Sequence, residues 1–122
     1  MTDPRPKAAA GHLFLHAKGV KAATQRLEQV GVRTIVGREN FAVLELRGGT
    51  HIVLRELEGE GPVDAPFDLM YDRIEDAQAL FTEAGFELSD FKDGRIHRSF
   101  YATSPEGFRI QVLDSHAGDR PV

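Results

Sequence analysis

The sequence predicts an α+β fold built from two tandem β-α-β-β-β modules. The main observation is an internal repeat, because residues 18–31 (KGVKAATQRLEQVG) and 72–85 (DRIEDAQALFTEAG) share helical apolar spacing and both end at glycine. Each repeat is preceded by one strand-like segment and followed by three more. A repeated unit of this kind indicates the overall architecture of a chain even before its individual helices and strands are assigned. The predicted product is a curved, eight-stranded mixed sheet around a cleft.

The first module is predicted over residues 11–57. Its helix lies among four strand-like segments: residues 12–17, 32–37, 41–46 and 50–57. The pair Gly48-Gly49 predicts a tight turn, so the last two of these segments are expected to form a hairpin.

A linker is predicted over residues 58–66, which are rich in turn-forming and charged residues. The second module then occupies residues 67–114, and its strands are predicted at residues 67–71, 86–90, 97–103 and 108–114. Asp72 and Glu75 have the spacing of a capping box for its helix. One domain, residues 11–115, is therefore expected between a flexible N-terminal tail, residues 1–10, and a C-terminal tail, residues 116–122.

Composition excludes several classes of function. The net charge is −4 and the basic residues are scattered, which argues against nucleic acid as a partner. No apolar run has membrane-spanning length, so a membrane partner is not expected. The absence of cysteine excludes disulfides, thiolate catalysis and Cys-type zinc sites. The cytoplasm is the expected location by default.

Two motifs connect the repeat to a known family. Residues 97–113 (HRSFYATSPEGFRIQVL) resemble the strand, D-P-(D/E)-G turn and final strand of the vicinal oxygen chelate superfamily, with Ser104 in place of the usual Asp. Residues 71–77 (YDRIEDA) are similar to its V-D-D-(I/L)-E-A helix entry. This superfamily includes glyoxalase I, bleomycin-resistance proteins, fosfomycin-resistance enzymes and extradiol dioxygenases. The resemblance therefore implies a glyoxalase-like fold and leaves the chemistry open.

The resemblance also implies a divalent metal (Zn, Ni, Mn or Fe) held by His, Glu or Gln side chains at the strand ends. It places ligands at His12 and Gln111. The repeat offset of 54 (85 − 31) matches His12 with Pro66, and alignment of the hairpin turns matches Gln111 with Val53. Since neither Pro nor Val can ligate through its side chain, a family-type site is disfavoured. Register shifts of two residues would restore a sensible donor set: His12, His51, Asp68 and Gln111.

Strand alternation predicts which other side chains line the cleft. The expected ligand-binding residues are Phe14, His16, Arg55, Met70, Tyr101 and Arg109. The arginines and histidines favour an anionic ligand through bidentate pairing, although Arg55 and Arg109 could instead form surface ion pairs. Glu45 lies in an apolar strand and is the candidate catalytic base if the protein is an enzyme.

Three functions are compatible with these residues. The favoured one is a small-molecule binder without a family-type metal site, like the bleomycin-resistance branch. The alternative is a divalent-metal-dependent lyase, isomerase or dioxygenase, and the third is an interaction or regulatory module. A homodimer is expected, because open module sheets of this family commonly pair across chains.

Overall fold

The computed structural model describes every residue except Met1 and His116. Within this part of the chain, the first module contains one helix and a four-stranded sheet of order β1-β4-β3-β2. Its elements are β1 (His12–Ala17), α1 (Val20–Gln29), β2 (Arg33–Gly37), β3 (Phe41–Glu45) and β4 (His51–Glu56). β1 pairs with β4 in parallel, and the other pairs are antiparallel.

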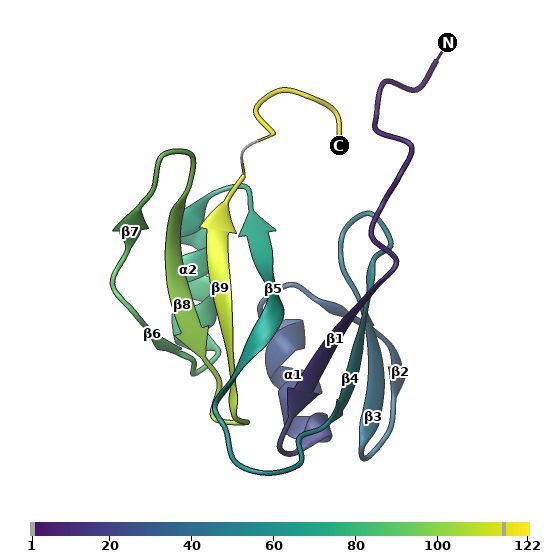
Figure 1. Cartoon of the computed structure of the whole chain (residues 1–122), viewed down its shortest axis with the longest axis vertical. Helices are drawn as coiled ribbons and strands as arrows, with labels where there is room; N and C mark the ends of the chain where they lie inside the picture. Colours follow the sequence, from purple (N-terminus) through teal and green to yellow (C-terminus); the bar gives the residue numbers. More distant parts are fainter. Residues whose placement is uncertain (1, 116) are drawn as a thin grey trace.

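The second module repeats this arrangement with one more strand. Its elements are β5 (Val63–Tyr71), α2 (Ile74–Glu83), β6 (Glu87–Leu88), β7 (Lys92–Asp93), β8 (Arg98–Thr103) and β9 (Phe108–Asp114). The sheet has the order β5-β9-β8-β6, and β7 also pairs with β8. The modules lie side by side, with β1 next to β5 (Figure 1). The α+β class and the two-module organisation are therefore confirmed, while the single sheet that was predicted is two sheets meeting at these strands. Among the described residues, no helix is long and apolar enough to cross a membrane.

β5 begins at Val63, inside the segment predicted as a linker. Its pairing with β9 shifts register between Asp64 and Asp68, which marks an irregularity in the strand. Pro66 lies within this irregular stretch, where a residue without an N–H group is tolerated. The predicted start of this strand, Phe67, was therefore wrong, because Pro66 was taken as part of the linker.

The segment predicted as one strand and a turn forms the two short strands β6 and β7 instead. The interruption lies at Ser89, whose hydroxyl oxygen accepts the backbone N–H of Tyr101 at 2.8 Å. Ser89 also donates its own N–H to the carbonyl of Tyr101 at 2.9 Å. One residue therefore satisfies both backbone groups of Tyr101, so β8 keeps its hydrogen bonds where its neighbouring strand is broken.

The two helices begin differently. The predicted capping box of α2 is wrong: its N-cap residue is Arg73, which makes no side-chain capping bond, and Asp72 pairs instead with Arg47 at 3.2 Å. At the start of α1, Glu56 of β4 accepts the backbone N–H of Val20 at 2.9 Å. A carboxylate at this end of a helix also interacts favourably with the helix dipole.

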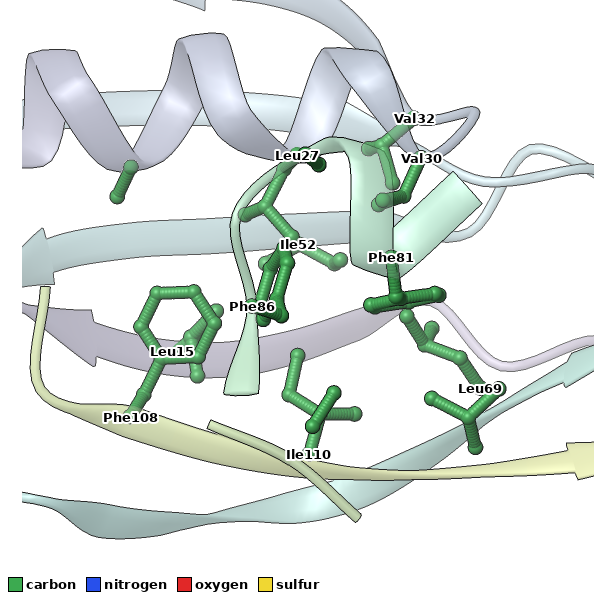
Figure 2. Packing of buried hydrophobic residues seen from close by; sticks show 14 of the residues in the cluster. Leu15, Leu27, Val30, Val32, Ile52, Leu69, Phe81, Phe86, Phe108 and Ile110 are labelled. Atoms are coloured by element: carbon green, nitrogen blue, oxygen red, sulfur yellow. The ribbon is translucent and has the colours of Figure 1, made fainter. Parts of the chain in front are cut away.

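One hydrophobic core runs through both modules. In Figure 2, Leu27 of α1, Leu15 of β1 and Phe108 of β9 point into the same interior as Phe81 and Phe86 of the second module. The helices lie behind the sheets in the view of Figure 1, so they cover one face of each sheet. On the opposite faces, which we call the open faces, the described residues form no helix.

A partly buried ion pair joins the modules at their helical side. Arg26 of α1 donates to Glu106, in the turn between β8 and β9, through bonds of 2.7 and 3.0 Å, and it also donates to the carbonyl of Ala84. The hydroxyl oxygen of Ser104 accepts the N–H of Glu106 at 3.0 Å, as short polar side chains commonly do two residues before such a group in a turn. Gly85 gives the arginine room, because a Cβ atom there would lie 2.7 Å from Nη1 of Arg26.

Candidate functional site

The site residues predicted from strand alternation lie on the open faces. Each alternates along its strand with a side chain of the core, as Phe14, which is 51% exposed, does with Leu15, which is 1% exposed. In the second module, Tyr101 alternates with the buried Phe100, and Arg109 and Gln111 flank the buried Ile110. The predicted facing of these strands is therefore confirmed.

A row of polar residues crosses the open face of the first sheet. Arg33, Glu45, His51 and His12 are successive cross-strand partners on β2, β3, β4 and β1. Glu45 accepts a hydrogen bond from Nε of Arg33 at 3.1 Å, and its other oxygen lies 3.0 Å from Nε2 of His51. The imidazole centroids of His12 and His51 are 6.1 Å apart. The row therefore has an Arg–Glu ion pair on β2 and β3 and two histidines on β4 and β1.

The neighbours of Glu45 stabilise its ionised form. The hydrogen bonds from Arg33 and then from His51 hold the pKa of this carboxyl below its usual range. A carboxylate with a lowered pKa is a weaker proton acceptor. The contacts thus favour a role in which Glu45 orients His51 over the predicted role of catalytic base.

The candidate metal ligands occur as two separate pairs. His12 is the cross-strand partner of His51 on the first sheet, and Asp68 is the cross-strand partner of Gln111 on the second. Throughout the described part of the chain, no three His, Asp or Glu side chains are grouped so that they could hold a metal ion. The described residues therefore do not fit a family-type metal site built on three His, Asp or Glu ligands within one chain.

Two hollows lie on the open face of the second sheet and share Tyr101 and Arg109. The first, of about 320 Å³, is also bordered by residues 64–68 of β5 and by Gln111. The second, of about 480 Å³, is also bordered by β6, by Lys92 and by Thr103. Both volumes are in the range of small-molecule sites.

Tyr101 has two cations close to its ring. The guanidinium carbon of Arg109 lies 4.6 Å from the ring centroid, and Nζ of Lys92 lies 5.5 Å from it. Arg109 also donates two hydrogen bonds to Asp64, of 2.7 and 3.1 Å. These bonds hold the pKa of Asp64 below its usual range and raise the pKa of Arg109. The region therefore combines an aromatic surface with two cations, Arg109 and Lys92, and it also holds three carboxylates, those of Asp64, Asp68 and Glu87.

The structure thus divides the predicted site between the sheets. The first hollow brings together Asp68, Tyr101, Arg109 and Gln111. The other predicted residues lie outside both hollows: Met70 on β5, and His12, Phe14, His16, Glu45, His51 and Arg55 on the first sheet.

Sequence reasoning missed three charged residues of the hollows: Asp64, Glu87 and Lys92. Asp64 had been assigned to the linker and Lys92 to a turn, so neither entered the alternation argument. A signal existed for Asp64, because it lies an even number of residues before Asp68 and would share its face in a longer strand. No comparable pattern marked Lys92, since β7 has only two residues.

No protein-family model matches the chain, and no curated protein matches it either. Solved structures do. A member of the glyoxalase/bleomycin resistance protein/dioxygenase superfamily from Sphaerobacter thermophilus DSM 20745 has a TM-score of 0.71 at 14% identity, over 88% of this chain and 98% of its own. A "possible glyoxalase" from Bacillus cereus has a TM-score of 0.66 at 26% identity, over 86% and 97%. TnmS3, an antibiotic-binding protein from Streptomyces sp. CB03234, has a TM-score of 0.70 at 17% identity, over 88% and 95%.

Proposed function

For this chain, which has the fold of the glyoxalase/bleomycin resistance protein/dioxygenase superfamily as its motifs predicted, we propose a role in binding a small anionic molecule. The proposed site is the open face of the second sheet. The observation that carries the proposal is the Tyr101 ring, which lies between two hollows with Arg109 and Lys92 within 5.5 Å of its centroid.

The chemistry of this region supports an anion with an aromatic or planar part. Arginine binds carboxylates and phosphonates through paired hydrogen bonds, and lysine adds a second positive charge. The Tyr101 ring offers a flat apolar surface to the rest of the ligand. The antibiotic-binding activity named for TnmS3 is one precedent for small-molecule binding on this fold.

A metal-dependent lyase, isomerase or dioxygenase is the second candidate. The His12–His51 pair favours it, because two imidazoles lie on neighbouring strands of the first sheet with their centroids 6.1 Å apart. In that case His12 and His51 would donate two ligands to the metal, and the remaining ligands would have to come from residues other than this pair. The metal-free function is favoured because, among the described residues, no three His, Asp or Glu side chains are grouped so that they could hold an ion.

Titration with benzoate, phenylphosphonate and neutral benzamide tests the proposal. We expect the two anions to bind more tightly than benzamide and to shift amide NMR signals around Tyr101. Arg109→Gln should weaken benzoate binding by about tenfold or more, since hydrogen bonds to charged groups contribute about 1.5–3 kcal/mol each. Arg47→Gln, which removes an exposed arginine outside both hollows, is the matched control.

Two outcomes would contradict the proposal. If none of the three probes binds, the hollows are not a site for small aromatic anions. If Arg55→Gln abolishes benzoate binding while Arg109→Gln does not, the site lies on the first sheet. Stoichiometric metal in protein purified without chelator, lost in His12→Ala, would instead favour the metal-dependent candidate.

We also propose that the protein forms a homodimer through its open faces. Phe14 is 51% exposed in the middle of β1, next to the polar row, and a second chain could cover it. Light scattering should then give about twice the 13.5 kDa chain mass, and Phe14→Ser should shift the equilibrium toward the monomer. A monomer at all concentrations up to about 1 mM would contradict this, since a complex weaker than that is marginal.

A further inference from the structure

We propose that Asp64 is a built-in counter-anion that occupies Arg109 until an aromatic carboxylate displaces it. This inference rests on the proposed function and deepens it. It names the ligand class, an aromatic ring bearing a carboxylate, and it assigns Asp64 as a residue that determines specificity.

The geometry of the ion pair is that of a bound carboxylate ligand. The two oxygens of Asp64 accept from Nε and Nη2 of Arg109 at 2.7 and 3.1 Å, so one edge of the guanidinium is saturated by a paired contact. Asp64 and Arg109 are also cross-strand partners on β5 and β9, which places the two side chains directly opposite one another. An incoming carboxylate that uses this edge must take the place of the Asp64 carboxylate.

The Asp64 carboxylate lies where a ligand would bind. Asp64, Arg109 and Tyr101 border the same hollow. The Arg109 guanidinium lies over the Tyr101 ring at 4.6 Å, so a carboxylate on Arg109 brings any attached ring close to that aromatic surface. The side chain of Asp64 has no aromatic part, so it cannot stack on the Arg109 guanidinium or on the Tyr101 ring. A benzoate-like ligand would gain both contacts.

The pair is also exposed enough to exchange. The side chains of Arg109 and Asp64 are 42% and 68% exposed, so both remain in contact with solvent. Exposed ion pairs are weak. When a ligand takes its place on Arg109, the exposed Asp64 carboxylate can be solvated by water instead. A neutral ligand cannot replace the lost charge on Arg109, and a cation would be attracted to Asp64 rather than displace it. Asp64 therefore lowers the affinity of Arg109 for every anion, so that an anion displaces it only by making a further contact, such as that of an aromatic ring with Tyr101.

Benzoate affinity in four variants tests this inference. Asp64→Asn removes the competing charge, and we expect it to strengthen benzoate binding by about two- to fivefold, the fold-change that matches the usual contribution of an exposed pair. Asp93→Asn is the matched control, because it removes the same charge from another exposed Arg–Asp pair, Asp93 with Arg98 at 3.3 Å, outside both hollows. The double variant Asp64→Asn/Arg109→Gln should bind benzoate as weakly as Arg109→Gln alone, because the gain requires a free Arg109.

The outcomes separate this inference from the function on which it rests. If wild-type protein binds benzoate and Asp64→Asn binds it equally or more weakly, the counter-anion role is overturned while the anion site stands. Tighter binding of benzylamine than of benzoate, lost in Asp64→Asn, would also overturn it, since Asp64 would then be a ligand for a cation. If neither wild type nor Asp64→Asn binds benzoate, both the inference and the proposed anion site fail.

Discussion

Replacing Phe81 with alanine is expected to lower the free energy of unfolding by about 3–5 kcal/mol, the usual cost of removing a buried phenylalanine side chain. Phe81 is fully buried on α2. Its ring packs edge-on against three others: Phe86 at 4.9 Å, Tyr71 at 5.7 Å and Phe100 at 5.9 Å between centroids. These partners come from a loop and two strands, so the cavity would be lined by elements that cannot all move to fill it.

Denaturant unfolding monitored by circular dichroism measures this effect. The matched control is Leu80→Ala on the same helix, because Leu80 is 38% exposed and its replacement should cost less than about 1 kcal/mol. Near-equal losses in the two variants would contradict the packing described for Phe81. They would mean that α2 does not present this face to the core.

Replacing Glu106 with alanine is expected to cost about 3 kcal/mol, because it leaves Arg26 without its carboxylate in a mostly buried place. The side chains of Arg26 and Glu106 are 24% and 9% exposed. The partial exposure of Arg26 places the expected cost at the lower end of the range for broken buried pairs. The change also removes the acceptor of the bond that Ser104 donates at 3.0 Å.

A double-mutant cycle separates the ion pair from other effects of the Glu106 change. If an unpaired Arg26 causes most of the loss, Arg26→Ala/Glu106→Ala should be clearly more stable than the sum of the single variants predicts. The exposed pair Arg47–Asp72, with side chains 69% and 73% exposed, is the control and should show coupling of at most about 1 kcal/mol. Strict additivity at Arg26 and Glu106 would contradict the account of a bridge between the modules.

The prediction of the open faces shows how far alternation along a strand can reach. Once Gln111 was placed on the cleft side, the facing of Arg109 followed from its spacing, and the facing of Tyr101 followed from the assumption that Phe100 is a core residue. The same reasoning failed for Asp64, because Pro66 interrupted the pattern of β5 and the strand was started too late. It also failed for Lys92, which pairs with β8 through a strand of only two residues.

The predicted metal ligands illustrate a different limit. The sequence contains four chemically reasonable donors. The strand registers pair His12 with His51 and Asp68 with Gln111. Whether two such pairs meet depends on how one sheet is placed against the other. The repeat offset cannot predict this placement. An offset matches equivalent positions in the two modules, but it does not determine the angle between them.

The sequence by itself determined the two helices, most of the strands, the division of their side chains between core and open face, and the superfamily fold. These features follow from local periodicity and from an internal repeat, and both can be recognised in the sequence without knowledge of the tertiary structure. The tertiary structure decided that the site is divided between two sheets, that Asp64 holds Arg109 beside Tyr101, and that Arg26 reaches Glu106 across the modules. The last two contacts join residues separated by 45 and 80 positions, and such contacts arise only when packing of the whole core brings distant strands and turns together.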